Sequence, residues 1–411
     1  MEIYEKWWGF MINIDRVMRD ITTVGEIGRN DGQGITRVAF SDEYNQATKI
    51  LINLMEETGL VVKVDPVGNI IGLKKGLDNS LPSIIFGSHL DTVVNGGLYD
   101  GLLGIVSGLE CIRAINENNY KNIHPIELIA FNAEEGSEMG GTFGSRAMLG
   151  QINLDDENLM NKAKLYNLNR QDIINSIRYP GAIKCFIELH IEQGGILDNN
   201  DISIGIVNGV AGITRYKITI KGESNHAGTT PMNLRNDALI EACKVILRSE
   251  QIVKSIGGSI VSNVGIVKIF PGAVNVIPGK VELILELRDL DQKEIEKAIR
   301  KIINENIPNE GYKIDYIEIT RKEPIKLDNS IIRIIKECCI SKNIKYMIMP
   351  SGAGHDAKEF EQFIPSGMIF IKSNKGVSHC PEEYSEKNDI EIGTKILYET
   401  IIALDKKDNI I

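Results

Sequence analysis

The amino-acid sequence predicts an α/β fold in which a smaller α+β domain is inserted into a larger, layered domain. The 411 residues are more than a single hydrophobic core usually holds. Helical and buried-strand patterns alternate from about residue 43 and again after about residue 325. Between them, half-exposed strands and helices follow in the order β-α-β-β-α-β, the ferredoxin-like arrangement. The expected domains are therefore 1–211 together with 326–411, and an inserted domain at 212–325.

Composition and charge exclude several classes of protein. The 46 basic and 56 acidic residues give a net charge of −10, which argues against a nucleic-acid partner. No apolar run reaches the roughly 18 residues that a membrane span needs. Charges interrupt the N-terminal segment, so we interpret it as a first helix with Trp7, Trp8 and Phe10 packed inward, not a signal peptide. The six cysteines form no CxxC pair, which favours reduced thiols in a cytoplasm.

The first part of the large domain shows a regular alternation of elements. Gly59 is expected to end a helix, and Asp100 to stand at the start of a largely buried one. The expected elements are a helix at 43–59, a strand at 83–91, a helix at 100–119, a strand at 126–133, and strands at 185–194 and 202–209.

The inserted domain begins with the alternating strand "YKITIKGE". A later helix starts at Asp291, with Glu294 three residues on as its capping-box partner. The other elements expected in the inserted domain are a helix at 236–255, strands at 259–269 and 280–289, the helix from Asp291, and a strand at 313–322.

The large domain resumes after about residue 325. Its expected elements there are strand, loop and helix at 347–360, strand and loop at 366–385, and a last helix at 388–406.

The histidines are few and mostly stand where strands end. A single histidine is usually a structural polar group, but five in loop-like contexts favour a shared site. The sixth, His124, precedes a proline at a strand start, so we predict a structural role for it. The five candidates are His89, His190, His226, His355 and His379.

The segment "GSHLDTVVNGGLYDG" carries the first candidate ligands. His89 follows a strand, and the Asp91 carboxylate lies two residues on, where it could orient the imidazole. Asp100 stands at a helix N-terminus, where an anion is favoured. A plain helix cap is the alternative for Asp100, and a surface polar pair for His89 and Asp91. The glycines around Asp100 favour a bent backbone and a metal site of the zinc, manganese, cobalt or nickel type.

The segment "IELIAFNAEEGSEMGG" ends a buried-type strand with two adjacent carboxylates, Glu134 and Glu135. If the strand ends at Ala133, a turn at Glu134–Gly136 lets both carboxylates reach one site. One could bind a metal, while the other takes a proton from water. A solvated acidic loop is the alternative, which the buried-type strand and the glycines disfavour.

Seven motifs occur in order along nearly the whole chain: "GSHLDTVVNGGLYDG", "FNAEEGSEMGGTFGSRAMLG", "ELHIEQGGIL", "GESNHAGTTPMNLRNDA", "RDLD", "SGAGHDA" and "SHCPEEYS". Together they resemble the N-carbamoyl-L-amino-acid hydrolase, allantoate amidohydrolase and β-ureidopropionase group. That group belongs to the dinuclear-metal aminoacylase and carboxypeptidase superfamily.

The resemblance implies an α/β metallohydrolase that holds two divalent ions per subunit, zinc, manganese, cobalt or nickel. It also implies a homodimer whose inserted domain acts as lid and dimerisation surface. The implied roles are His89 and His190 at one ion, Asp100 between the two ions, Glu135 and His379 at the other, Glu134 as general base, His226 at the carbonyl oxygen, Asn275 and Arg288 at the substrate carboxylate, and Gln193 and His355 at the substrate pocket.

The resemblance leaves alternatives for the substrate. Hydrolysis of an N-carbamoyl-L-amino acid is the first expectation, and allantoate or β-ureidopropionate is the alternative. Ile213 stands where allantoate-type relatives often carry glutamine, which mildly favours a carbamoyl amino acid. A non-catalytic metal-binding scaffold is a remote alternative, because no implied ligand or base is missing. Cys380, beside His379, is either a bystander or a competing thiol.

Overall fold

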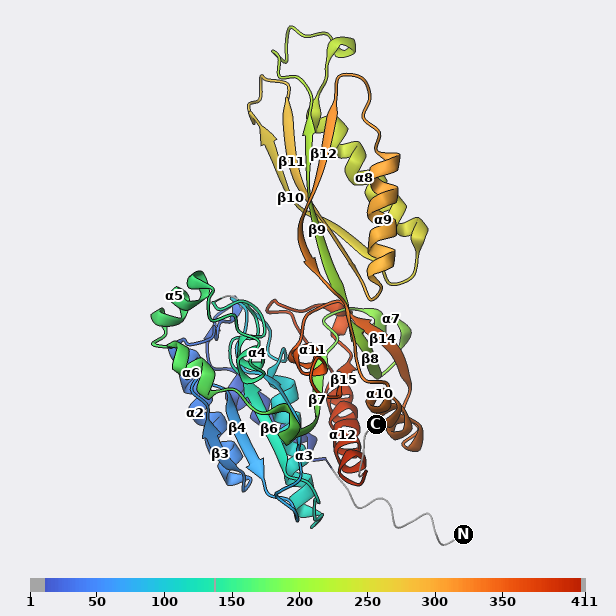
Figure 1. Cartoon of the computed structure of the whole chain (residues 1–411). Coiled ribbons are helices and arrows are strands. Elements are labelled where there is room, and N and C mark those ends of the chain that lie inside the picture. Colours follow the sequence, from blue (N-terminus) through green and yellow to red (C-terminus); the bar gives the residue numbers. More distant parts are fainter. Residues whose placement is uncertain (1–11, 137, 408–411) are drawn as a thin grey trace. The chain divides into compact units, whose positions relative to one another are not determined.

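The computed structural model describes residues 12–136 and 138–407. The chain forms two compact units, of which unit 1 runs to Asn208 and resumes at Leu327, while unit 2 is Gly209–Lys326 (Figure 1). The second unit is thus inserted in the sequence of the first, close to the expected 212–325. The helix predicted around Trp7, Trp8 and Phe10 lies outside the described residues, and the first described helix is α1 (Ile14–Gly25).

Unit 1 is built on one mixed sheet. Its central strands β15, β7, β5 and β6 are parallel to one another, whereas β8 pairs antiparallel with β15, β4 with β6, and β3 with β4. In the described ranges the strands run across the sheet in the order β13 (Ile325–Lys326), β8 (Ile204–Val210), β15 (Ser366–Ile371), β7 (Ile183–Ile191), β5 (Ser83–His89), β6 (Ile126–Phe131), β4 (Ile70–Lys74) and β3 (Val61–Val64), while β14 (Tyr346–Ser351) pairs with β8.

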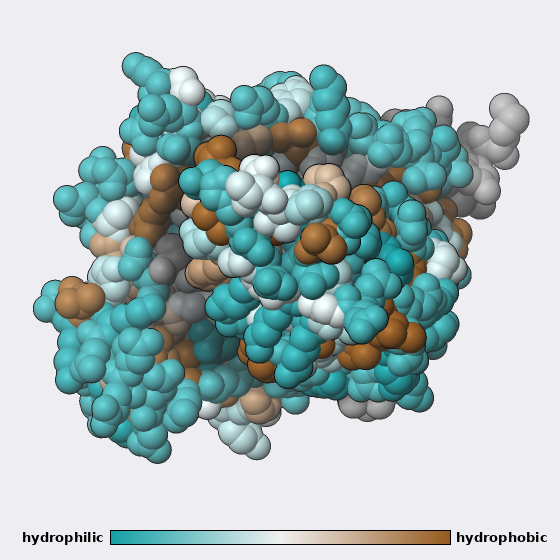
Figure 2. Space-filling view, turned by 90° about the horizontal axis from the view of Figure 1, so that it is seen from above, coloured by the Kyte–Doolittle hydropathy of each residue, from teal (hydrophilic) through white to brown (hydrophobic). Residues whose placement is uncertain are grey.

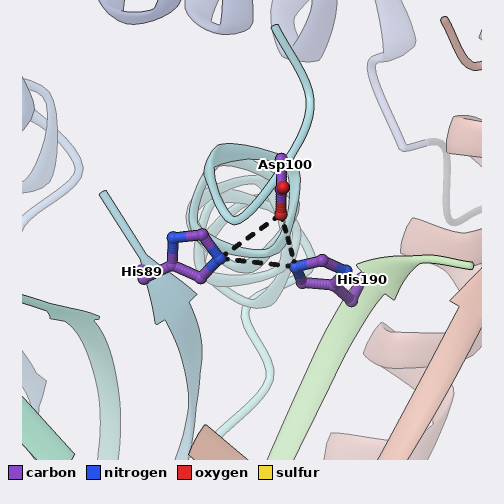
Figure 3. A group of neighbouring side chains, drawn as sticks. All are labelled: His89, Asp100 and His190. Atoms are coloured by element: carbon purple, nitrogen blue, oxygen red, sulfur yellow. Dashed lines mark hydrogen bonds and ion pairs between the residues drawn. The ribbon is translucent and has the colours of Figure 1, made fainter. Parts of the chain in front are cut away.

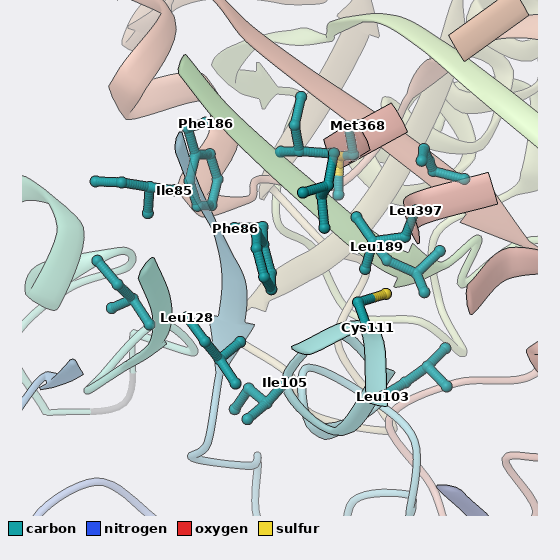
Figure 4. Packing of buried hydrophobic residues seen from close by; sticks show 14 of the residues in the cluster. Ile85, Phe86, Leu103, Ile105, Cys111, Leu128, Phe186, Leu189, Met368 and Leu397 are labelled. Carbon is teal, nitrogen blue, oxygen red and sulfur yellow. The ribbon is translucent and has the colours of Figure 1, made fainter. Parts of the chain in front are cut away.

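Helices bury the central strands on both faces. Every residue of β5 and β6 is buried, which explains their continuous apolar character. Phe86 and Leu128 lie toward helix α3 (Leu102–Glu117) (Figure 4). Phe186 stacks on Phe360 of α11 (Asp356–Glu361), with 4.3 Å between ring centroids. The helices of unit 1 are α1, α2 (Asp42–Glu57), α3 (Leu102–Glu117), α4 (Phe143–Met148), α5 (Glu157–Leu165), α6 (Arg170–Asn175), α7 (Ile196–Asn200), α10 (Asn329–Ser341), α11 (Asp356–Glu361) and α12 (Lys387–Asp405).

Unit 2 is a four-stranded antiparallel sheet with two helices. Buried Val281, Leu283, Leu285 and Leu287 alternate with outward residues along one strand and face the helices. The elements are β9 (Gly212–Lys221), α8 (Ala238–Ile256), β10 (Val261–Phe270), β11 (Lys280–Asp289), α9 (Gln292–Glu305) and β12 (Lys313–Lys322), and the order across the sheet is β10-β11-β9-β12. This is the strand order of a ferredoxin-like fold.

Two local expectations were wrong. The strand expected at 126–133 ends at Phe131, because Ala133 takes a left-handed conformation with φ of 56°. The capping box expected at the start of α9 does not form: the Asp291 side chain accepts from Lys293 N, but Glu294 pairs with Lys297 instead. Both corrections arise where a side chain or backbone finds a partner that the local pattern does not reveal.

The surface in Figure 2 is mainly hydrophilic, with hydrophobic residues dispersed among the polar ones. None of the helices in the described ranges has the length and apolar character needed to cross a membrane.

Candidate metal centre

The carboxyl ends of two neighbouring parallel strands bring the first group of candidate ligands together. His89 is the last residue of β5, and His190 lies one residue before the end of β7. Their Nε2 atoms are 3.5 Å apart, and Asp100 Oδ1 lies 3.4 Å from His89 Nε2 and 3.0 Å from His190 Nε2 (Figure 3). Open α/β sheets place their sites at this edge.

A second group shares Asp100 with the first. Asp100 Oδ2 lies 3.0 Å from His379 Nε2, and Glu135 Oε1 lies 3.5 Å from the same nitrogen. One carboxylate therefore presents a different oxygen to each group. Each set combines imidazole and carboxylate donors, which is the ligand chemistry of zinc and similar divalent ions.

Asp100 does not act as a helix cap. The N-cap of α3 is Gly101, which has no side-chain capping bond, and the Asp100 carboxylate faces the histidines instead. Gly101 has φ of 65°, and a Cβ there would lie 2.5 Å from the His89 ring. Glycine is thus required both for the backbone conformation and for the close approach of the histidine.

The adjacent carboxylates reach the site through a tight turn after β6. Glu134 N and Glu135 N donate to the two oxygens of Asp91, at 3.0 and 3.1 Å. Glu134 Oε2 then lies 4.0 Å from His89 Nε2, while Glu135 faces His379. Glu134 is 8% exposed, so the solvated-loop alternative does not fit.

The predicted contact between Asp91 and His89 differs in detail. His89 Nδ1 lies 2.9 Å from the backbone carbonyl oxygen of Asp91, whereas the nearest carboxylate oxygen is 4.0 Å away. The carboxylate is instead used to hold the turn that carries Glu134 and Glu135. Asp91 therefore orients the imidazole through its main chain and the two glutamates through its side chain.

The carboxylates and imidazoles shift one another's proton affinity. Burial, followed by the charge of Asp100, raises the pKa of Glu135 to about 7, and burial likewise raises the pKa of Glu134. Burial alone would raise the pKa of Asp100, but contact with His190, His379 and His89 lowers this pKa well below its usual value. Contact with Asp100 raises the pKa of His379 to about 9.

The site contains the unsatisfied atoms that a cation would serve. Asp100 Oδ1 and Glu135 Oε1 are buried and, within the described chain, engage in no well-aligned hydrogen bond. Divalent ions bound at the two groups would give each of these oxygens a partner and reduce the repulsion between the clustered carboxylates. The residues present therefore fit a metal ion.

Two further predicted residues lie beside this centre. Gln193 Nε2 donates to Asp100 Oδ2 at 3.1 Å and lies 3.0 Å from His379 Nε2. The His355 ring packs edge-on against His190, with 4.5 Å between centroids, and its Nε2 lies 3.1 Å from Ser351 Oγ. Burial lowers the pKa of His355 well below its usual value, which favours the neutral ring.

Glu188, His190 and His355 form a third group of potential ligands, but their atoms are already engaged. Glu188 accepts from Ser88 Oγ at 2.8 Å and from the backbone N–H of Ala357 at 3.0 Å. His355 contacts Ser351, and His190 Nε2 faces Asp100. This group therefore supports the ligands instead of forming another metal site.

The remaining predicted residues lie in unit 2. His226 forms an isolated β-bridge with Val276, and the N–H of the next residue, Ala227, donates to Asn275 O at 2.9 Å. The structure thus brings His226 and Asn275 close together. Arg288 lies near the end of β11, where its Nε donates to Glu286 Oε1 at 2.8 Å.

His124 lies outside these groups. Its Nδ1 is 2.9 Å from Pro82 O and its Nε2 is 2.8 Å from Lys184 Nζ, which agrees with a structural role.

One residue beside the site was not anticipated. Glu383 accepts hydrogen bonds from the backbone of Tyr99 and Asp100 and from Ser378. Its signal in the sequence is weak: an acidic residue four positions after His379, in a loop where neighbouring Glu382 is exposed. Only the fold separates the two glutamates.

Comparison with known proteins identifies the family. Residues 85–403 match the peptidase family M20/M25/M40. The chain belongs to this family. An N-carbamoyl-L-amino-acid amidohydrolase of Pseudomonas sp. (strain NS671) is 39% identical over 408 residues, 95% of this chain and 98% of the relative. An allantoate amidohydrolase of Escherichia coli (strain K12) is 34% identical over 389 residues, 91% of this chain and 94% of the relative.

A solved structure shares the fold of this chain. An amidase of the hydantoinase/carbamoylase family from Burkholderia multivorans superposes with a TM-score of 0.87 at 27% identity, covering 97% of this chain and 99% of that one. The large sheet with its helices is therefore a fold of family M20/M25/M40.

Proposed function

We propose that this protein hydrolyses the ureido C–N bond of an N-carbamoyl-L-amino acid, giving the free amino acid, CO₂ and ammonia. The observation that carries the proposal is the pair of histidine–carboxylate groups that share Asp100, with Glu134 buried beside them. The name of the Pseudomonas relative, which aligns over nearly the whole chain, supports the substrate class.

Two divalent ions would complete this centre. His89 and His190 would hold the first ion, Glu135 and His379 the second, and Asp100 would contact both. Zinc, manganese, cobalt and nickel suit these donors. When bound, such ions polarise a carbonyl oxygen and lower the pKa of water.

Glu134 is the proposed general base. It faces His89 from 4.0 Å and belongs to neither proposed ligand set. Its carboxylate would take a proton from the water that attacks the ureido carbon. It would then give that proton to the leaving nitrogen as the C–N bond breaks, so that one residue serves both transfers.

Residues of unit 2 would recognise the substrate. The planar guanidinium of Arg288 offers two parallel N–H donors to a carboxylate, and Asn275 would add an amide donor. His226 would bind the carbonyl oxygen, where negative charge develops during attack. Gln193 and His355, in unit 1, would line the pocket.

Allantoate is the second candidate substrate, because the Escherichia coli relative carries that name. Allantoate, β-ureidopropionate and N-carbamoyl-L-amino acids share a ureido group and a carboxylate, so the same machinery serves all three. The resemblance to the allantoate type implies glutamine where Ile213 stands, so Ile213 mildly favours the carbamoyl amino acid.

A substrate panel tests the proposal. Protein reconstituted with manganese or zinc would be incubated with N-carbamoyl-L-amino acids, allantoate and β-ureidopropionate, and the released ammonia measured. We expect the highest kcat/KM with an N-carbamoyl-L-amino acid. Faster turnover of allantoate would reassign the substrate, and inactivity of metal-loaded protein on all three would favour a metal-binding scaffold.

Metal content is a separate test. Elemental analysis of the reconstituted protein should approach two ions per chain. A stoichiometry of one or zero after reconstitution contradicts the dinuclear centre.

Unit 2 is the proposed lid and dimerisation surface. Strand β10 is an edge strand, and its Val261 and Ile266 side chains are 55% and 51% exposed. An unpaired edge with exposed apolar side chains suits a self-complementary, two-fold contact with another copy. We further propose that His226 acts at the metal centre of the partner copy.

Subunit mixing tests this arrangement. His226→Ala and Glu134→Gln would each be inactive alone. In a mixed dimer, one site combines an intact Glu134 with an intact His226 from the neighbour, so activity should partly return. If exchange occurs and activity stays absent, His226 acts within its own subunit or has no catalytic role.

We also propose a cytoplasmic location. All six cysteines are free thiols, which suits a reducing compartment.

A further inference from the structure

Glu383 joins the two chain segments that supply Asp100 and His379. Its Oε1 accepts the backbone N–H groups of Tyr99 and Asp100, at 2.9 and 3.0 Å. Its Oε2 accepts from Ser378 Oγ at 2.8 Å and lies 3.4 Å from His379 N. One carboxylate therefore fixes the main chain of two candidate ligands that are almost 280 residues apart in the sequence.

The local sequence leaves room for this carboxylate. A Cβ at position 97 would overlap both the carboxylate and the Cβ of Glu383. The φ angle of Gly97 is not positive, so its backbone conformation does not itself require glycine. Glycine at position 97 therefore provides space for the Glu383 side chain and is not needed for a special turn. Glu383 itself is 5% exposed, whereas the neighbouring Glu382 and Glu386 are exposed.

We propose that Glu383 is a positioning residue that holds Asp100 and His379 at the spacing required by the second metal ion, the ion of the Asp100, Glu135 and His379 group. This inference rests on the dinuclear centre of the proposed function. Glu383 would not bind the ion, because both of its oxygens are occupied by main-chain and hydroxyl donors. It sets where the two ligands stand, as residues behind metal ligands commonly do.

The contacts predict a graded effect of substitution. Glu383→Ala leaves two buried backbone N–H groups without their acceptor and separates the loop of His379 from that of Asp100. Glu383→Gln keeps an amide oxygen for Tyr99 and Asp100, but it turns an N–H donor toward the N–H of His379. The second ion should therefore be weakened strongly by alanine and less by glutamine.

The first ion provides an internal reference. The first ion shares Asp100 with the second, but its other two ligands, His89 and His190, stand on β5 and β7, and neither is hydrogen-bonded to Glu383. The first ion should therefore be weakened less than the second, which has both Asp100 and His379 displaced. A residue that merely stabilises the fold would weaken both ions to a similar extent, or lower the melting temperature of the metal-free protein without selecting one ion. Selective loss of the second ion separates positioning from general stability.

The experiment is a Mn²⁺ titration of metal-free, full-length protein, followed by calorimetry and by electron paramagnetic resonance. Wild type should bind two ions and give the spectrum of a spin-coupled pair. In Glu383→Ala the second dissociation constant should rise roughly 10–100-fold, the first should rise by a smaller factor because it keeps His89 and His190, and the coupled signal should give way to that of isolated ions. Glu383→Gln should fall between, and the exposed neighbour Glu386→Gln should behave as wild type.

The inference is overturned if the second dissociation constant is the same in wild type and both Glu383 variants, or if both ions weaken equally. Should Glu383→Ala fail to fold, the glutamine variant decides by the same comparison of the two ions. A wild type that binds fewer than two ions overturns this inference together with the dinuclear centre. The Mn²⁺ titration needs no substrate. A negative result in the substrate panel alone would therefore not affect the conclusion about Glu383.

Discussion

Replacing Glu134 by glutamine should separate activity from stability. Glu134 is buried, its backbone is fixed by Asp91, and its Oε2 lies 4.0 Å from His89 Nε2. Glutamine has the same shape, so the turn after β6 and the bonds to Asp91 should persist. What would disappear is the proposed ability to accept a proton from water and return it to the leaving nitrogen.

The size and sign of the two effects follow from the site. Loss of a positioned base lowers kcat by roughly 10²–10⁴-fold, equivalent to about 3–5 kcal/mol of activation free energy. Burial, with neighbouring acidic charges, raises the pKa of Glu134 well above its usual value, so its charge is unfavourable in the metal-free fold. The uncharged variant should therefore be at least as stable as wild type above the pKa of an unfolded glutamate.

The assay compares Glu134→Gln with Glu135→Gln. Turnover of the best substrate would be measured across a range of metal concentrations, and thermal unfolding would be followed without metal at pH 8. Excess metal should restore part of the activity of Glu135→Gln, because Glu135 faces His379 and is the proposed metal ligand, but none of the activity of Glu134→Gln. Normal turnover by Glu134→Gln, or its restoration by excess metal, would refute the assignment of the base.

Three further outcomes are expected. Arg288→Lys keeps the positive charge but loses the planar guanidinium fork, so KM for the carbamoyl amino acid should rise by about tenfold or more. If wild type hydrolyses an amide analogue that lacks the substrate carboxylate as fast as the acid, Arg288 has a structural role. Gly101→Ala should abolish tight metal binding, because its Cβ would lie 2.5 Å from the His89 ring; calorimetry with unchanged affinity would contradict this. Burial raises the pKa of Glu361, which accepts from Ser366, to about 7. Between about pH 4.5 and about pH 7 the folded state therefore holds a proton on Glu361 that the unfolded chain releases. As pH rises through this range, the unfolding free energy of wild type should fall relative to that of Glu361→Gln. The expected loss is on the order of 1 kcal/mol, because Glu361 is partly exposed, and denaturant unfolding at several pH values measures it.

Much of the fold is encoded in local patterns. Continuous apolar runs predicted β5 and β6, and the alternating pattern of unit 2 predicted its six elements in the observed order. The strand expected at 313–322 has those bounds in the structure. Element ends were less predictable, because the end of β6 depends on the conformation of Ala133 and on a carboxylate more than 40 residues away. Contacts of that kind leave no periodic signal.

The composition of the site was easier to predict than its supports. The residues His89, Asp100, Glu135, His190 and His379 carry the donor chemistry, and the structure brings them together. Their supports use main-chain groups, which every residue possesses. The sequence therefore does not reveal which carboxylate caps which N–H.

The same reasoning explains why three residues around the centre have unusual backbone conformations. Ala133, Gln193 and His379 have φ of 56°, 58° and 58°, in a region that non-glycine residues rarely adopt. Such conformations cost on the order of 1 kcal/mol each and persist only when surrounding contacts impose them. Here the contacts are the bonds of Asp91 to the turn after Ala133, of Ser373 Oγ to Gln193 N, and of Glu383 to the loop of His379. Each strained residue thus lies beside a polar side chain that fixes the local main chain. Gln193 and His379 each direct a side-chain nitrogen toward the two groups that share Asp100, and Ala133 precedes Glu134 and Glu135, whose carboxylates face those groups. The strain and the clustered carboxylates are both unfavourable without a cation, and a bound ion would offset the repulsion between the carboxylates.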